Sequence, residues 1–502
     1  MIRKSTKDLY EAYRKSMRKI ADLRYAGAVL QWDQETYLPP KGAPLRGQQI
    51  STLSEMAHEL FTDEKQGSLL EELLERNELT DKEKKNVFLS LEDYTRQRKL
   101  SSEFVRNLSE AVNKSFHNWI QARKMNDFNL FAPDLAILVV LKKEEAEYIG
   151  YKDHPYDALL DEFDKGSTVA RLDKAFNGIR QPLKDLLDTI MARPQVNDTF
   201  LHQHFPKDQQ WAFGLEILKE LGYDMEAGRQ DISEHPFTVN FNSNDVRITT
   251  RIDENDFSNM LWSCIHEAGH ALYEQGLPDS EYGLPSGEAA SLTIHESQSR
   301  LWENHVGRSR LFCEKQFPLI LKYFPSQFKG MSAEDIYKGI NKVQPSLIRT
   351  EADELTYHFH VMIRFGLEKA LLEGSIQSND IPACWKEQYS KYLNIKVPDD
   401  KQGCLQDVHW SHGSFGYFPT YSLGSFCAAQ FFGTAGKEVP SLENDLGNGN
   451  YVSLLTWLRS SVHQHGRTYD SEELMEKISG KKLDIENFYT YILDKYKNIY
   501  NF

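Results

Sequence analysis

The residues best suited to chemistry in this sequence are the five in His266-Glu-Ala-Gly-His270. On an α-helix, two histidines four residues apart differ by only about 40° around the axis, so both imidazoles can reach one metal ion. Glu267 follows the first histidine directly and lies close enough in angle to hold a water on that ion. Zinc lowers the pKa of such a water towards about 7, and the carboxylate then accepts its proton. The motif therefore predicts a hydrolytic zinc site with His266 and His270 as ligands and Glu267 as the base.

A catalytic zinc also needs a third protein ligand, which this motif does not contain. The longer metzincin motif is absent, because Tyr273 and Gly276 stand where it requires glycine and histidine. A second helix is predicted to begin near Ser286 and to carry His295-Glu-Ser-Gln298. Its Glu296 follows the second histidine by 26 residues, a separation that suits a helix–loop–helix return. Spacing alone leaves three rivals open, namely Glu288, His295 and Glu303.

The metal motif is predicted to lie on an amphipathic helix that Asp256 caps. Phe257, Leu261, Cys264 and Ala268 form the apolar face of that helix. Position 264 lies about 200° from position 266, so the core face and the ligand face point in opposite directions. Cys264 is therefore predicted to be a core residue and not a ligand.

A β-hairpin is predicted immediately before the metal helix. Residues 237–241 and 246–252 alternate in polarity on either side of Asn242-Ser-Asn-Asp245. Such a hairpin either offers an edge strand to an extended peptide or serves as a scaffold for the metal helix. Helical periodicity dominates the remaining sequence, for example at Ile50, Leu53, Ala57 and Leu60.

Composition limits the class of protein. The 502 residues are 40% hydrophobic and carry a net charge of −15, so a large folded core is expected and neither nucleic acid nor an anionic membrane suits the surface as a partner. Five widely spaced cysteines suit a reducing compartment. The charged first residues lack the apolar segment of a secretory signal, and the longest apolar run is far shorter than the roughly 20 residues of a bilayer span. A soluble, cytoplasmic protein is predicted.

Six sequence elements in order resemble the carboxypeptidase Taq family of metallocarboxypeptidases. They follow that family's HPF, D-x-R-x-T, HExxH, H-E-S-Q, I-R-x-x-A-D and G-x-x-Q-D-x-H-W patterns. In this chain they are His235–Phe237, Asp245–Thr249, His266–His270, His295–Gln298, Ile348–Asp353 and Gly403–Trp410. The H-E-S-Q element supplies the third metal ligand in the family, so the resemblance favours Glu296 over its rivals.

The resemblance implies a mainly α, gluzincin-like fold with a long substrate groove and a small β-hairpin or sheet beside the zinc helix. It implies one metallocarboxypeptidase domain over residues 1–502, with two helical lobes flanking the groove and a zinc-site core at about 235–425. It further implies one Zn²⁺ per chain, for which Co²⁺ can substitute, and a homodimer. The activity implied is stepwise removal of C-terminal residues from peptides, with broad specificity.

Peptide hydrolysis also needs donors for the developing oxyanion, and the segment from His409 to Tyr421 is rich in them. Its His412, Tyr417 and Tyr421 resemble the His/Tyr loop of related helical oligopeptidases. We therefore predict His409, His412, Tyr417 and Tyr421 as catalytic residues. The alternative is that these rings only pack after a glycine-rich turn.

A carboxypeptidase must bind a free α-carboxylate, which a guanidinium does with two aligned hydrogen bonds. Arg349, assisted by Tyr421, is the first candidate, and Arg247 in the hairpin is the second. The alternative for Arg349 is a structural ion pair with Asp353, four residues later.

Two other functions are alternatives to a zinc carboxypeptidase. The zinc motif does not determine where a peptide is cut, so an endo-acting zinc oligopeptidase is the second candidate. A helical binding protein with a vestigial metal site is the alternative from another class. The intact Glu267 argues against it, because a structural metal site needs no base.

Overall fold

The computed structural model describes residues 5–502 and is 70% helical, with one small three-stranded sheet. The predicted mainly α fold is confirmed. No helix in these residues is both long and apolar enough to cross a membrane. All five cysteines are free thiols.

The chain forms two compact units, each built from three segments that lie far apart in the sequence. Unit 1 contains the chain up to Arg98, Asp198–Ile340 and Gln430–Lys482. Unit 2 contains Lys99–Asn197, Asn341–Ala429 and Leu483–Phe502. That the chain acts as one catalytic domain with two lobes stays a prediction.

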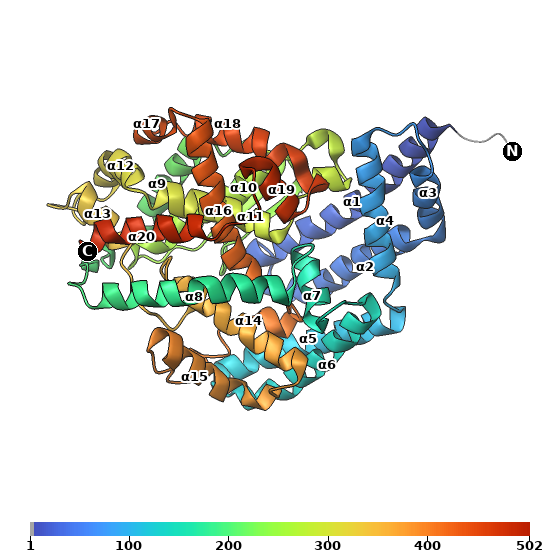
Figure 1. Cartoon of the computed structure of the whole chain (residues 1–502), viewed down its shortest axis with the longest axis horizontal. Helices are drawn as coiled ribbons and strands as arrows, with labels where there is room; N and C mark the ends of the chain where they lie inside the picture. The colour runs from blue at the N-terminus through green and yellow to red at the C-terminus, as the bar shows by residue number, and fades with distance from the viewer. Residues whose placement is uncertain (1–4) are drawn as a thin grey trace. The chain divides into compact units, whose positions relative to one another are not determined.

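Unit 1 holds the metal motif and the sheet. Its α-helices are α1 (Thr6–Thr36), α2 (Ala43–Thr62), α3 (Glu64–Leu74), α4 (Asp81–Arg98), α9 (Lys207–Leu221), α10 (Phe257–Glu274), α11 (Leu292–Arg300), α12 (Arg310–Tyr323), α13 (Ala333–Ile340), α17 (Leu442–Gly447), α18 (Val452–Ser461) and α19 (Ser471–Ser479). A π-helix, η6 (Leu301–Gly307), continues directly from α11. Helices α1 to α4, blue in Figure 1, pack around a buried core that includes Tyr13, Leu70 and Val87.

Unit 2 is helical throughout its regular elements. Its α-helices are α5 (Ser102–Met125), α6 (Ala132–Ile149), α7 (Pro155–Phe163), α8 (Val169–Met191), α14 (Tyr357–Glu373), α15 (Ile381–Leu393) and α20 (Glu486–Tyr500). The boundary between the units falls within α16 (Phe418–Glu438), at Ala429.

The sheet of unit 1 has the order β1-β3-β2, so β2 is an edge strand. Strands β2 (Thr238–Asn242) and β3 (Asp245–Thr250) form the predicted hairpin, with an irregularity between Asn240 and Asn242. Strand β1 (Gly228–Ile232) was not predicted and pairs parallel to β3. Its sequence, Gly-Arg-Gln-Asp-Ile, lacks the apolar alternation by which a half-buried strand is predicted.

Five buried phenylalanines hold the beginning of the metal helix α10. Phe257, the first residue of α10, contacts the rings of Phe205, Phe213, Phe324 and Phe328. All five side chains are at most 2% exposed. Close packing of large rings leaves little freedom to shift, so this cluster fixes where α10 starts.

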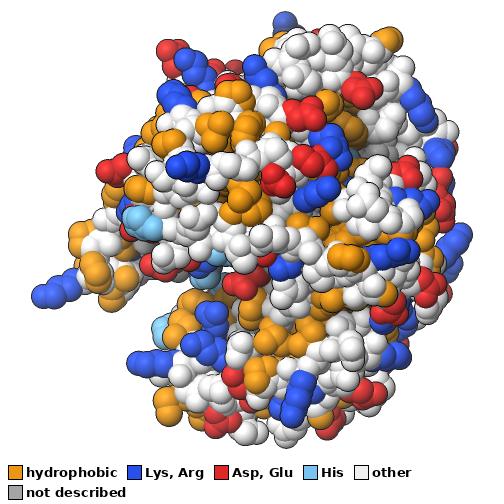
Figure 2. Space-filling model, turned by 90° about the vertical axis from the view of Figure 1, so that its left-hand side faces the viewer, with side chains coloured by type: hydrophobic (Ala, Val, Ile, Leu, Met, Phe, Trp, Pro, Cys, Tyr) orange, Lys and Arg blue, Asp and Glu red, His pale blue; other side chains and the backbone are white. Residues whose placement is uncertain are grey.

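Acidic and basic side chains are interspersed with apolar ones on the face shown in Figure 2. The net charge of −15 is therefore not gathered into one acidic area on that face.

Candidate metal centre

Helix α10 begins and lies as the sequence predicts. The Asp256 carboxylate accepts a hydrogen bond of 2.7 Å from the Ser258 backbone N–H and so caps the helix. Leu261, Cys264 and Ala268 are fully or almost fully buried on its core face. Burial raises the pKa of the Cys264 thiol well above its ordinary value, which agrees with its predicted role in the core.

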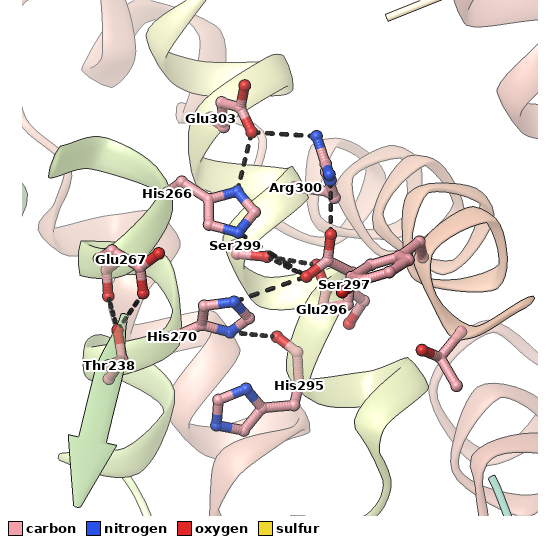
Figure 3. A network of polar contacts seen from close by, with 12 residues as sticks. Thr238, His266, Glu267, His270, His295, Glu296, Ser297, Ser299, Arg300 and Glu303 are labelled. Atoms are coloured by element: carbon pink, nitrogen blue, oxygen red, sulfur yellow. Dashed lines mark hydrogen bonds and ion pairs between the residues drawn. The ribbon is translucent and has the colours of Figure 1, made fainter. Parts of the chain in front are cut away.

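Three side chains from two helices converge on one point in unit 1 (Figure 3). His266 and His270 come from α10, and Glu296 comes from α11. One ligand atom from each lies within 4.8 Å of the others. The Glu296 Oε2 atom is 3.7 Å from His266 Nε2 and 3.5 Å from His270 Nε2.

The Nδ1 atom of each histidine has a hydrogen-bond partner within the protein. His266 Nδ1 lies 2.9 Å from Glu303 Oε2, and His270 Nδ1 lies 3.0 Å from the His295 backbone carbonyl. A carboxylate and a carbonyl only accept hydrogen bonds, so each Nδ1 must carry the proton and each Nε2 presents a lone pair. Two imidazole nitrogens and one carboxylate oxygen are one of the donor sets found in catalytic zinc sites. The residues therefore fit a divalent metal.

Glycine at position 269 allows Glu296 to reach the two histidines. A Cβ atom at Gly269 would lie 2.6 Å from Ser299 Cα and 2.7 Å from the Gln298 carbonyl oxygen. Helices α10 and α11 thus contact each other backbone to backbone, which no larger residue permits. This close approach brings the carboxylate of α11 to the ligand face of α10.

The π-helix η6 places Glu303 behind the first histidine. Its wide turn closes with a hydrogen bond from the Arg308 N–H to the Glu303 carbonyl, five residues apart. The Glu303 carboxylate also accepts from Arg308 Nη2 at 3.1 Å and Arg300 Nη1 at 3.3 Å. Arg300 Nε donates to Glu296 Oε1 at 2.6 Å, so one guanidinium joins both carboxylates. Such π-turns are frequently found at functional sites.

Electrostatics favour the protonation states that a metal requires at Glu296 and His270, but not at His266. Burial alone would raise the pKa of Glu296, but Arg300 and His266 hold it well below its ordinary value. Burial lowers the pKa of His270 to about 3. Burial would also lower the pKa of His266, but Glu296 and Glu303 raise it above its ordinary value. Metal binding therefore competes with a proton only at His266.

Glu267 lies on α10 beside His266 and is 7% exposed. Its carboxylate Oε2 accepts a hydrogen bond of 2.5 Å from the Thr238 hydroxyl of β2. Burial raises the pKa of this carboxyl group above its ordinary value.

The rivals for the third ligand have other partners. Glu288 lies 3.6 Å from Arg467, and His295 Nε2 lies 2.8 Å from Glu274. Helix α11 begins at Leu292 and not near Ser286, because the Ser291 hydroxyl accepts from the Ile294 N–H and caps the helix there. Glu303 is the partner of His266 Nδ1. In the sequence, Glu303 follows Glu296 by seven residues, which is two turns of an α-helix. This spacing indicated that both carboxylates lie on the same face of the helix.

The predicted oxyanion donors lie in unit 2. His409 Nε2 is 3.0 Å from the Tyr421 hydroxyl, and the Tyr417 ring contacts both of these rings. Burial lowers the pKa of His409 to about 3, so its ring is neutral near pH 7. The His412 ring packs against Phe116 of α5. The structure thus gathers His409, Tyr417 and Tyr421 into one cluster.

Buried Glu368 of α14 holds the segment that carries this cluster. Its carboxylate accepts from Trp410 Nε1 at 2.8 Å and from the Gly416 N–H at 2.9 Å. Gly416 has a φ of 101°, and a Cβ there would lie 2.8 Å from the Leu159 carbonyl oxygen. The turn between His409 and Tyr417 is therefore fixed at both ends.

Arg349 pairs with Asp407 and not with Asp353. Its Nε and Nη2 atoms lie 3.0 and 2.9 Å from Asp407 Oδ1. The helical turn at Arg349 covers only Arg349–Glu351, and Ala352 is extended, so the residue four positions later does not share its face. Asp353 instead accepts a hydrogen bond of 2.7 Å from the Thr356 hydroxyl.

Two further residues surround Arg349. Its Nη1 donates to the Tyr357 hydroxyl at 3.0 Å, and Arg364 Nε donates to Asp407 Oδ2 at 2.6 Å. Sequence reasoning missed the roles of Asp407 and Arg364, although Asp407 lies within the G-x-x-Q-D-x-H-W element.

Arg247, the second candidate for carboxylate binding, lies on β3 in unit 1. It forms two hydrogen bonds with Asp245, of 2.8 and 2.9 Å. Its guanidinium also lies over the Trp32 ring, 4.4 Å from the centroid.

Comparison with known proteins also indicates a metal-dependent enzyme. Residues 12–496 match the family described as carboxypeptidase Taq (M32) metallopeptidase. The chain belongs to this family. It is therefore a metal-dependent carboxypeptidase, a hydrolase that acts on peptides.

Relatives of this M32 carboxypeptidase match over nearly their whole length. Thermostable carboxypeptidase 1 of Thermus thermophilus is 39% identical, over 98% of this chain and 99% of that protein. A crystal structure of an M32 carboxypeptidase from Deinococcus radiodurans is 37% identical, with a TM-score of 0.97 over 99% of this chain and 100% of that one. A solved structure described only as CHT is 58% identical, with a TM-score of 0.96 over 97% and 99% of the two chains.

Replacing Glu303 by Gln tests whether this carboxylate orients His266. An amide can present its NH₂ group to Nδ1 and no longer fixes the tautomer, so we expect zinc affinity to fall about 10–100-fold. Competition with a chelating dye measures this affinity. Glu314→Gln, at an exposed position of α12, is the control and should bind zinc as the wild type does. Unchanged affinity in Glu303→Gln would show that His266 needs no such partner.

Replacing Gly269 by Ala tests the close approach of α10 and α11. The added methyl group must push α11 away, so we expect a loss of about 1–3 kcal/mol of stability together with weaker zinc binding. Thermal unfolding with and without zinc measures both. Gly433→Ala in α16 is the matched control, because its Cβ would meet nothing within 4 Å, and it should not lower stability. A Gly269→Ala protein with wild-type melting and zinc affinity would contradict the account.

Proposed function

We propose that this M32 carboxypeptidase uses zinc to remove single residues from the C-terminus of peptides, with broad specificity. One observation carries the proposal: the ligand atoms of His266, His270 and Glu296 converge within 4.8 Å, beside the buried carboxylate of Glu267. The homodimer and the cytoplasmic location stay predictions, and light scattering of the purified protein tests the first.

His266, His270 and Glu296 would hold one Zn²⁺, for which Co²⁺ can substitute. Two imidazoles and a carboxylate suit these ions better than Mg²⁺ or Ca²⁺, which prefer oxygen ligands only. When bound, the metal supplies Lewis-acid chemistry, since it lowers the pKa of a water and polarises the scissile carbonyl.

Glu267 is proposed as the general base and then the general acid. Its carboxylate accepts a proton from the attacking water and delivers that proton to the leaving amine nitrogen. The position of this buried carboxylate, on the residue next to the proposed ligand His266, supports the proposal, because a base must lie within reach of the water that it deprotonates.

His409, His412, Tyr417 and Tyr421 are proposed to donate hydrogen bonds to the substrate and to the developing oxyanion. The 3.0 Å contact between His409 and the Tyr421 hydroxyl supports this role, because it holds a phenol in a defined orientation. A neutral His409 can accept the phenol proton or donate to an oxyanion, depending on its tautomer.

Arg349 is proposed to bind the C-terminal carboxylate of the substrate. Arg349 and Arg364 bring two buried positive charges to Asp407, which supplies one negative charge. A buried excess of positive charge is costly unless an anion pairs with it, and the substrate carboxylate is such an anion. Arg247 is the second candidate, but Asp245 already neutralises it.

Product analysis by mass spectrometry tests the proposed activity. One N-blocked peptide is offered with a free and with an amidated C-terminus, each with and without chelator. We expect loss of single residues from the free end only, stopped by chelator and restored by Zn²⁺. Internal cuts in both peptides would replace the proposal with an oligopeptidase, and a lack of cleavage by zinc-loaded protein would favour a binding protein.

Glu267→Gln tests the role of the base. The amide cannot accept the proton, so we expect kcat to fall at least about 10²–10⁴-fold while zinc binds with unchanged affinity. Substantial activity in the zinc-loaded variant would contradict the mechanism.

Arg349→Met tests the carboxylate site. Hydrogen bonds to charged groups contribute about 1.5–3 kcal/mol, so we expect kcat/KM for the peptide with a free C-terminus to fall by about 10–100-fold, mainly through KM. Arg106→Met, at an exposed position of α5, is the control. If the two variants have the same KM, another residue binds the carboxylate.

A further inference from the structure

Thr238 of the edge strand β2 contacts the proposed base directly (Figure 3). Its hydroxyl lies 2.5 Å from Glu267 Oε2 and 3.0 Å from the Glu267 backbone carbonyl oxygen. Both acceptors belong to one residue, and the hydroxyl has a single proton to share between them. The shorter contact is to the carboxylate, so the hydroxyl links the Glu267 side chain to strand β2. The same hydroxyl lies against the backbone of α10 at Glu267.

The strand holds Thr238 in place through the residue before it. Thr249 of β3 binds both backbone polar groups of Phe237: its hydroxyl accepts from the Phe237 N–H at 2.9 Å, and its N–H donates to the Phe237 carbonyl at 2.9 Å. The Ser233 hydroxyl donates to Thr249 Oγ1 at 2.7 Å. Thr249 is fully buried, so this junction cannot move freely.

This junction joins two motifs that the metal site leaves unexplained. Phe237 ends the His-Pro-Phe element, and Thr249 ends the Asp-Val-Arg-Ile-Thr element. Their hydrogen bonds fix the start of β2, where Thr238 lies opposite Ile248 in the ladder. A continuous series of contacts therefore runs from the two motifs, through Thr238, to the carboxylate of Glu267.

We propose that Thr238 is a positioning residue for the reaction, which holds Glu267 Oε2 so that Oε1 faces the attacking water. The inference rests on the proposed function, in which Glu267 accepts a proton. A glutamate side chain has three rotatable bonds, and only some of its conformations bring an oxygen to the water. Thr238 selects among them without placing a positive charge beside the carboxylate. An arginine in the same place would make the carboxylate a weaker base.

Two variants of Thr238 separate the hydroxyl from the shape of the side chain. Thr238→Val keeps the volume and removes the hydrogen bond, and we expect kcat to fall about 10–100-fold because the base is no longer held in position. KM for the peptide with a free C-terminus and the zinc affinity measured with a chelating dye should stay within about twofold of wild type. Thr238→Ser restores the hydroxyl and should return kcat to within about threefold of wild type.

Thr250→Val is the matched control. Thr250 lies on the neighbouring strand β3, and its hydroxyl binds Ser263 of α10 at 2.8 Å. The control removes a hydroxyl between the same sheet and the same helix, away from Glu267. Its kcat should stay within about twofold of wild type. Equal losses of kcat in Thr238→Val and Thr250→Val would mean that both act through packing, and would overturn the inference.

Measuring Glu267→Gln in the same series distinguishes the inference from the function on which it rests. If Glu267→Gln is inactive and Thr238→Val has wild-type kcat, Thr238 does not position the base, and the proposed function stands. If Glu267→Gln is active, both proposals are wrong. A Thr238→Val protein that loses zinc affinity together with kcat would also overturn the inference, because the defect would then lie in the metal site.

Discussion

The contact between α10 and α11 at Gly269 is the constraint on which the metal site depends. The two backbones approach so closely that a single methyl group would lie 2.6 Å from Ser299 Cα. Only this approach places a carboxylate of one helix beside two histidines of the other. The phenylalanine cluster at the start of α10 and the Asp256 cap determine where that helix begins. The π-helix η6 then turns Glu303 towards His266.

Within this arrangement, two buried glutamates acquire opposite properties. Glu296 lies beside Arg300, which holds its pKa low and keeps it ionised as a metal ligand should be. Glu267 lies beside a neutral hydroxyl, and burial raises its pKa. Environments that move two pKa values apart suit two carboxyl groups to different roles, and the roles proposed here are a metal ligand for Glu296 and a base for Glu267.

Local signals in the sequence accounted for much of this site. The i, i+4 histidines, the Asp256 cap and the alternation on either side of Asn242–Asp245 each depend on neighbouring residues, and the helix, its cap and the hairpin are confirmed. Features that depend on distant partners were missed or misplaced. Strand β1 has no apolar alternation and exists because β3 offers it a partner. Arg349 pairs with Asp407, 58 residues away, because its own helical turn ends at Glu351.

The central claim is that His266, His270 and Glu296 hold one catalytic zinc. Anomalous diffraction from zinc-loaded crystals at the zinc absorption edge tests it most directly. We expect one strong peak per chain, within about 2 Å of the Nε2 atoms of both histidines and of a Glu296 carboxylate oxygen. A peak bound through Nδ1, a peak that has Glu303 or His295 in place of Glu296, or a peak elsewhere in the chain would contradict it.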